Sequence, residues 1–176
     1  MYEEYDLILE PGTRLKPRSK RVRAGLADDR RLDRDFTCLH CRNTVSTHPL
    51  LSGVNNRNHC PYCLYSRHLD LFEAGDRLSA CKAGMRPVGL ALKRSKKKYP
   101  GAGRGELMLV HLCEECGKAS LIRLAADDDA DLIFEVYTTP FGLAEDERRQ
   151  LCKSGVEVLQ VGDMRLVREQ LFGVAV

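Results

Sequence analysis

The sequence has no tryptophan, and only 6% of its 176 residues are aromatic, although 43% are hydrophobic. A chain of this length usually forms one compact domain, which must bury enough apolar surface to offset the entropy lost on folding. The apolar supply is thin for that purpose. We therefore expect a source of stability besides a hydrophobic core.

The sequence also lacks an uncharged apolar run of roughly 18 residues, the length that a membrane helix requires. Three of its first six residues are acidic and none is basic, whereas a secretory signal peptide begins with basic residues followed by apolar ones. We expect a soluble cytoplasmic protein with reduced thiols and no membrane partner. In that setting, paired cysteines favour metal binding over disulfides.

Cysteine is abundant, and six of the eight cysteines form three CxxC pairs. The first pair is Cys38 and Cys41, and the second is Cys60 and Cys63, within the stretch Arg57-Asn58-His59-Cys60-Pro61-Tyr62-Cys63. The 18 residues between Cys41 and Cys60 match the spacing of a four-cysteine zinc site. Each pair is typical of a tight turn, called a knuckle, whose backbone amides point at the sulfurs. These two pairs predict one structural zinc ion.

The third pair, Cys113 and Cys116, is followed by Gly117 and lies between two apolar runs, 107–112 and 119–124. Strand, knuckle and strand in that order are typical of a zinc-ribbon hairpin. Glycine after the second cysteine suits a backbone turn that other residues resist. We expect this pair to bind a second zinc ion.

A second ion needs two further ligands for the third pair. Cys81 supplies a sulfur, and either His68 or His111 supplies a nitrogen, which completes a Cys₃His site. We prefer His68, because His111 precedes Cys113 by only two residues and would strain to reach the same ion. Asp70 is placed to orient the His68 imidazole. An exchanged pairing, in which Cys38 and Cys41 join Cys113 and Cys116, remains open.

Closed sites of this kind stabilise a fold, each zinc ion contributing on the order of 10 kcal/mol, and leave no open position for catalysis. Cys60-Pro61-Tyr62-Cys63 also matches a glutaredoxin redox motif. That motif follows an apolar strand, whereas residues 55–59 here are polar. A CPYC redox protein and a metal-dependent enzyme with one open site are therefore weaker hypotheses.

Charge is unevenly distributed along the chain. Residues 1–125 carry 23 Lys and Arg against 14 Asp and Glu, a net charge of +9, whereas residues 126–176 have a net charge of −6. Two basic runs are candidates for contact with RNA phosphates, the alternative for each being a solvated surface. These candidates are Arg14, Lys16, Arg18, Lys20, Arg21, Arg23, Lys93, Arg94, Lys96, Lys97 and Lys98.

The acidic C-terminal part opens with Asp127, Asp128, Asp129 and Asp131. We interpret these aspartates as the start of a helix, where carboxylates cap free amides; a Mg²⁺ site is the alternative. Beyond Pro140, the apolar pattern predicts two short amphipathic helices around a strand over 156–161. The eighth cysteine, Cys152, stands alone there and is expected to have no ligand role.

These patterns together predict a small mixed, β-rich α+β fold. Zinc-ribbon-type β-hairpins hold two structural zinc sites, and a short α/β C-terminal extension follows them. We expect a flexible basic N-terminal arm over 1–35, a zinc-ribbon domain over 36–128 and an acidic extension with short helices over 129–176.

The sequence resembles the RNHCP-domain family, named for the pentapeptide that is Arg57-Asn58-His59-Cys60-Pro61 here. The resemblance spans roughly residues 36–128. It includes the remaining paired cysteines and Cys81, together with Leu64, Ser66, His68, Asp70, Gly75, Asp76, Arg77, Gly84, Met85, His111 and Gly117. It implies a bacterial zinc-ribbon module whose ligand candidates include both His68 and His111, and it implies no activity.

We therefore expect a non-catalytic, zinc-binding protein that binds RNA, on the ribosome or elsewhere in translation. The alternative is a zinc-ribbon adaptor that binds a protein partner, its acidic C-terminal part docking elsewhere. Tyr62, Tyr65 and Tyr99 are the aromatic residues near the basic region that are candidates for stacking on bases.

Overall fold

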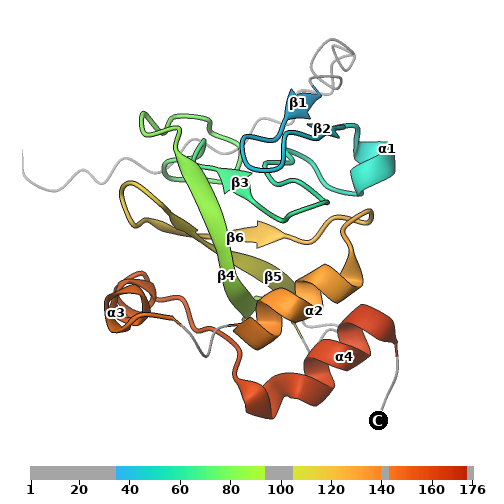
Figure 1. The fold of residues 1–176 in the computed structure, drawn as a ribbon, viewed down its shortest axis with the longest axis vertical. Coiled ribbons are helices and arrows are strands. Elements are labelled where there is room, and N and C mark those ends of the chain that lie inside the picture. Colours follow the sequence, from blue (N-terminus) through green and yellow to red (C-terminus); the bar gives the residue numbers. More distant parts are fainter. Residues whose placement is uncertain (1–34, 94–104, 140–142, 174–176) are drawn as a thin grey trace, which may run out of the picture.

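A computed structural model describes residues 35–93, 105–139 and 143–173 of the chain. Two antiparallel sheets are present in this part (Figure 1). A small sheet pairs β1 (Phe36–Thr37) with β2 (Thr44–Val45), and a larger one has the order β3 (Ser66–Arg67), β4 (Gly84–Lys93), β5 (Glu106–Cys113) and β6 (Ala119–Arg123). The helices are α1 (Pro49–Ser52), α2 (Ala130–Thr138), α3 (Glu145–Lys153), the 3₁₀ turn η3 (Val161–Asp163) and α4 (Met164–Phe172).

A long hairpin of β4 and β5 forms the centre of the larger sheet. Its register runs from Met85 opposite Cys113 to Lys93 opposite Glu106 and is interrupted by a bulge after Pro87. Proline has no N–H to give to the ladder, so a bulge beside it is expected. β4 is ten residues long, although it contains Gly84, Pro87 and Gly89.

β5 is buried along almost its whole length because both of its faces are covered. Leu107 and Leu109 pack in one core cluster with Ile133 and Tyr137 of α2. Alternate side chains, Val110 and Leu112, belong to a second cluster on the other face. Successive side chains of a strand point to opposite faces, so a continuous apolar run suits a strand buried on both sides.

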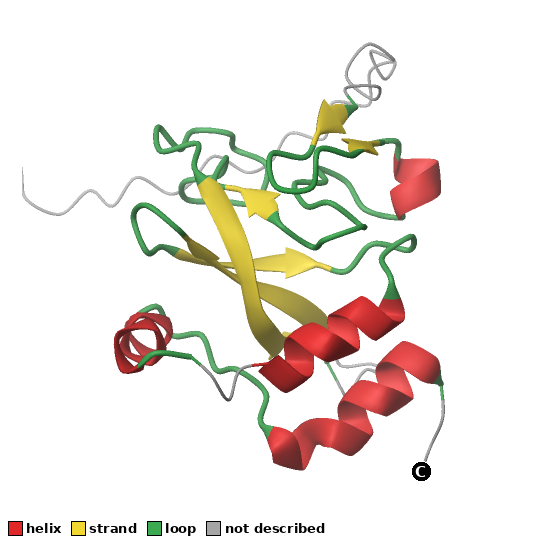
Figure 2. Ribbon diagram, in the orientation of Figure 1, coloured by secondary structure: helices red, strands yellow, loops and turns green. Residues whose placement is uncertain are grey.

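The C-terminal helices pack on the two faces of the larger sheet. Helices α2 and α4 lie together over one face, and Val167 of α4 is fully buried there (Figure 2). Leu151 of α3 packs in the cluster of Val110 and Leu112, beside Val156 and Val158. The acidic part of the sequence thus packs on the same sheet that carries the third CxxC pair.

The predicted helix start is confirmed, although only one of the four aspartates caps the helix. Asp129 is the N-cap of α2, and its side chain accepts hydrogen bonds from the backbone N–H groups of Asp131 and Leu132. The strand predicted over 156–161 is wrong: residues 156–160 form no strand, and Leu159 N donates a single backbone bond to Leu90 O. One such bond fixes the segment against β4 but does not extend the sheet.

The protein therefore has the predicted class, a small mixed α/β fold with antiparallel sheets and a short helical C-terminal part. Among the described residues, no helix has both the length and the apolar character needed to span a membrane. The predicted arm 1–35, apart from Asp35, lies outside the described residues, and so do Arg94, Lys96, Lys97 and Lys98. The proposed division at residue 128 stays a prediction.

Candidate metal centre

The three CxxC pairs share one local backbone geometry. In each, the amide of the first cysteine donates to the carbonyl five residues later, at Asn43, Tyr65 and Lys118 respectively. The carbonyl of that same cysteine accepts from the amide four residues later. The repeated pattern turns both cysteines of a pair toward one side. A knuckle predicted from spacing alone is thus present three times.

The residue after the second cysteine takes the left-handed conformation in every knuckle. Its φ angle is +66° at Arg42, +58° at Leu64 and +68° at Gly117. The predicted turn at Gly117 is confirmed. Two knuckles hold non-glycine residues in the same conformation, which costs about 1–2 kcal/mol each. The hydrogen bonds of the knuckle therefore outweigh a local strain that glycine would avoid.

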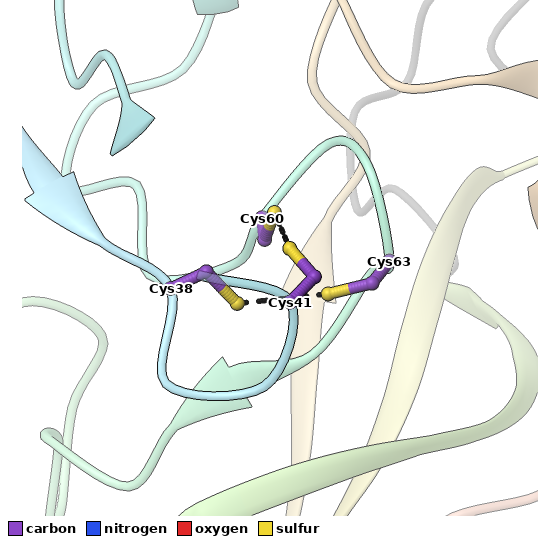
Figure 3. Close-up of side chains that lie close together, drawn as sticks. All are labelled: Cys38, Cys41, Cys60 and Cys63. Carbon is purple, nitrogen blue, oxygen red and sulfur yellow. Dashed lines mark hydrogen bonds between the residues drawn. The ribbon is translucent and has the colours of Figure 1, made fainter. Parts of the chain in front are cut away.

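The first two knuckles bring their four sulfurs together (Figure 3). Cys38 Sγ lies 3.6 Å from Cys63 Sγ, and Cys41 Sγ lies 3.5 Å from Cys60 Sγ. All four lie within 4.8 Å of one another. Four sulfurs arranged tetrahedrally at a Zn–S distance near 2.3 Å would be about 3.8 Å apart. The donor set and its spacing therefore fit a metal ion bound by four thiolates. This group is called cluster 1.

A second group, cluster 2, joins four residues from three segments. Cys81 Sγ lies 3.6 Å from Cys113 Sγ, and Cys116 Sγ lies 3.4 Å from His68 Nδ1. His68 follows β3, Cys81 precedes β4, and the other two cysteines form the knuckle between β5 and β6. A metal ion bound here would link both halves of the larger sheet.

The structure thus groups the eight candidate ligands into two sets of four. It places Cys38 and Cys41 with the second pair, not with the third. His111 is fully buried away from cluster 2 and bonds through Nε2 to Leu64 O at 2.7 Å. Burial lowers the pKa of His111 to about 4, so this imidazole is neutral at physiological pH.

The expected role of Asp70 is wrong. Its carboxylate accepts bonds from Asn58 Nδ2 and from the amides of Gly75 and Arg77. His68 Nε2 is buried and has no hydrogen-bond partner among the described residues. The two residues share a strand face in an ideal extended chain, but the loop after β3 turns Asp70 away from the ring.

The thiols of cluster 1 differ in their ease of ionisation. Burial raises the pKa of Cys60 to about 11 and raises that of Cys63 as well. Burial also opposes ionisation of Cys41, but hydrogen bonds from the Asn43 amide and the neighbouring thiols outweigh it and lower its pKa to about 6. Several adjacent thiolates repel one another, so a bound cation is required to hold all four in the ionised form.

The clusters also differ in exposure. Cys38 and Cys60 of cluster 1 are buried, whereas Cys81 and Cys116 of cluster 2 are exposed. Next to cluster 1, Tyr65 also stacks on His40 of the first knuckle, with ring centroids 3.7 Å apart. The lone Cys152 is exposed on α3 and belongs to neither cluster. Reagents that attack metal-bound thiolates therefore have freer access to cluster 2.

The structure has a buried ion-pair network next to cluster 1 that the sequence analysis did not predict. The Arg57 side chain is fully buried and bonds to Asp127 at 2.7 Å and to Asp128 at 3.1 Å. His59 Nε2 lies 2.7 Å from the same Asp128. Arg57 also donates to the carbonyls of Ser46 and His59. Two of the four aspartates expected at the helix start thus bind side chains of the RNHCP stretch.

Four further residues of the resemblance lie in a loop over 70–78, namely Asp70, Gly75, Asp76 and Arg77. Asn58 bonds to Asp70 and accepts from Arg77. Asp76 accepts four backbone amides within the loop, at 2.8–3.1 Å, from Leu71, Phe72, Glu73 and Leu78. These contacts hold the pKa of Asp76 well below its usual range, the Glu73 amide having the largest effect. A carboxylate two to five residues from the amides it binds could have suggested this loop in the sequence.

Comparison with known proteins identifies a family for this chain. The family model described as RNHCP domain matches residues 33–134, which include both clusters, the Arg57 network and the start of α2. Searches of curated proteins and of solved structures return no match. The match spans more than half of the chain, and the chain therefore belongs to the RNHCP domain family.

Proposed function

We propose that the protein holds two structural zinc ions and uses the scaffold they stabilise to bind RNA, on the ribosome or elsewhere in translation, without catalysing a reaction. The observation that carries the proposal is the convergence of four nitrogen and sulfur donors in each of two clusters. Such donor sets at tetrahedral spacing suit zinc better than magnesium or calcium, which take oxygen ligands.

The closed ligand sets favour a scaffold over an enzyme. A catalytic zinc ion usually has three protein ligands and one open position, whereas each cluster here offers four protein ligands. In cluster 1 an ion would join two knuckles, and in cluster 2 it would join the loop before β4 to the turn after β5. Such ions stabilise the positions of the strands and loops around them.

The RNA-binding part of the proposal depends on the cations. Lys93 ends β4 directly opposite Glu106 at the start of β5. The sequence between these paired strand ends carries Arg94, Lys96, Lys97 and Lys98, and a second basic run lies over 14–23. Lysine and arginine that contact phosphates release counterions, so the affinity they provide falls steeply with salt.

Metal analysis tests the first part. Protein purified under reducing conditions and measured by mass spectrometry of the elements should contain two zinc ions per chain. A content of one ion, or of a metal other than zinc after growth in balanced medium, would contradict this part.

Salt-dependent RNA binding tests the second part. Fluorescence anisotropy between 50 and 200 mM salt should show log affinity falling by about 0.9 per log unit of salt for each phosphate contact on a duplex. One variant replaces the six cations over 14–23 by glutamine, and another replaces the five over 93–98. Both should bind more weakly with a shallower slope. A matched variant with Arg149, Lys153 and Arg165 changed to glutamine should bind as the wild type does.

Ribonuclease distinguishes RNA binding from the adaptor alternative. Partners recovered with the tagged protein from a lysate should be lost after ribonuclease treatment. A protein partner that resists ribonuclease and requires the acidic residues after 126 would favour the adaptor. A salt-insensitive RNA affinity, or none in low salt, would contradict the RNA assignment.

A further inference from the structure

A pocket of about 490 Å³ lies between the RNHCP stretch and the larger sheet. Its walls come from residues 54–59, residues 70–74 and strand β6, and Lys93 contributes at one end. This pocket is called the β6 pocket. Its volume is within the range of sites that hold small ligands or one unit of a polymer. None of the residues in clusters 1 and 2 lines it.

One wall carries an aromatic ring on a restrained backbone. The side chain of Phe72 is 83% exposed, although its loop is held firmly. The backbone N–H of Phe72 donates to Asp76 Oδ2 at 2.8 Å, and Lys118 Nζ donates to the neighbouring carbonyl of Leu71. A loop restrained on both sides of an exposed ring presents a flat apolar surface at low entropic cost.

The rest of the lining offers amides and cations. Asn55 and Asn56 are exposed, and within the described part of the chain neither side-chain amide has a hydrogen-bond partner. Such amides can pair with the edge of a nucleobase. Lys93 and Arg123 supply positive charge, and Arg123 is oriented by an ion pair of 2.8 Å with Glu106. Two carboxylates, Asp70 and Glu73, also line the pocket. Asp70 already accepts three hydrogen bonds, from Asn58, Gly75 and Arg77.

We propose that the β6 pocket holds one nucleotide of single-stranded RNA, with the base stacked on Phe72 and its edge read by Asn55 or Asn56. Lys93 and Arg123 contact the adjoining phosphates. This inference rests on the proposed RNA binding and places part of it on described residues. A base can stack in such a pocket only when it is unpaired, so single strands should bind better than duplexes.

Anisotropy with labelled oligouridine, a duplex of equal length and free uridine monophosphate tests the proposal. Phe72→Ala should weaken oligouridine binding by roughly 5- to 100-fold, the effect of losing one stacked base. Removing an exposed ring leaves the core intact, and circular dichroism checks the fold. Leu50→Ala is the matched control, because Leu50 is 89% exposed on α1 but does not line the pocket; the affinity of this variant should not change.

The salt dependence of two lysine variants provides a second measurement. Lys93→Ala should reduce the salt slope for single strands by about 0.7, and Lys153→Ala on α3 should leave the slope unchanged. Wild-type RNA binding that Phe72→Ala leaves intact would overturn the pocket assignment and leave the proposed function standing. No RNA binding by the wild type at low salt would overturn both. Binding of the free nucleotide with no gain from the oligomer would overturn the assignment to an RNA strand.

Discussion

His59 and Asp128 are 69 residues apart in the chain, yet His59 Nε2 lies 2.7 Å from Asp128 Oδ2, and both side chains are fully buried. The same carboxylate pairs with Arg57 and accepts the amide of Ala125 at 2.7 Å. One aspartate therefore fastens the knuckle of Cys60 and Cys63 to the segment that leads into α2. This contact links the metal-binding part to the helical part.

Replacing Asp128 should be strongly destabilising. Asp128→Ala removes the fully buried carboxylate that pairs with both Arg57 and His59, and Arg57 keeps only its contact with the part-exposed Asp127. Loss of one partner of a buried pair costs about 3–5 kcal/mol. Urea unfolding of the metal-loaded protein measures the loss. Asp131→Ala is the control, since Asp131 is exposed on the first turn of α2, and it should shift the free energy of unfolding by about 0.5 kcal/mol or less. Equal effects of the two changes would contradict a structural role for the network.

The two clusters should release metal in a definite order. Cys81 and Cys116 are exposed, whereas Cys38 and Cys60 are buried, so a thiol-modifying reagent should empty cluster 2 first. Zinc release can be followed with a chromogenic chelator, and mass spectrometry of peptides identifies the cysteines modified at half release. Modification of Cys38 or Cys60 ahead of Cys81 would contradict the order.

Two histidines should differ in their effect on metal content. His68→Ala removes a donor from cluster 2 and should lower the zinc content from two ions per chain toward one. His111→Ala removes a buried ring outside the cluster, so it should lower stability but leave two ions bound. Elemental analysis after dialysis measures both. A lost ion in the His111 variant together with two in the His68 variant would reverse the assignment.

The knuckles predict opposite effects of glycine and alanine. Arg42 is exposed and has a φ angle of +66°, so Arg42→Gly should stabilise the protein by about 1 kcal/mol. Gly117→Ala should destabilise it by a similar amount, because a Cβ there meets no atom closer than 3.8 Å and the cost is conformational. Thermal unfolding of both variants measures the differences. A destabilised Arg42→Gly would show that the arginine side chain matters more than its backbone.

The loop over 70–78 should depend on one carboxylate. Asp76→Ala removes the acceptor of four amides, so hydrogen exchange at Leu71, Phe72 and Glu73 should accelerate. The pKa of Asp76 is well below its usual value of 3.8, so its stabilising effect is fully present above that value and is lost only as the pH falls through the folded pKa. Protection should therefore be constant between about pH 5 and 8 after correction for intrinsic exchange. Protection that falls within this interval would contradict the assignment.

Spacing was sufficient to predict the local structure of the metal centre. A CxxC pair dictates its own knuckle, because all of its hydrogen bonds lie within six residues. The partners of Arg57 and His59 could not be predicted, because Asp127 and Asp128 lie about 70 positions away in the sequence and resemble ordinary helix caps. The strand predicted over 156–161 failed for a similar reason, because a strand needs a paired neighbour and apolar alternation does not reveal one.

The order of the ligands along the chain also affects assembly. All four donors of cluster 1 lie within residues 38–63, and all four of cluster 2 lie within 68–116. The two sets do not interleave, so a ribosome that has released the first 63 residues has delivered a complete ligand set for one ion. Cluster 2 must wait for the β4–β5 hairpin, and the contact of Arg57 with Asp127 and Asp128 forms after both. Protease resistance of the N-terminal half should therefore appear earlier during synthesis when zinc is supplied than when zinc is withheld.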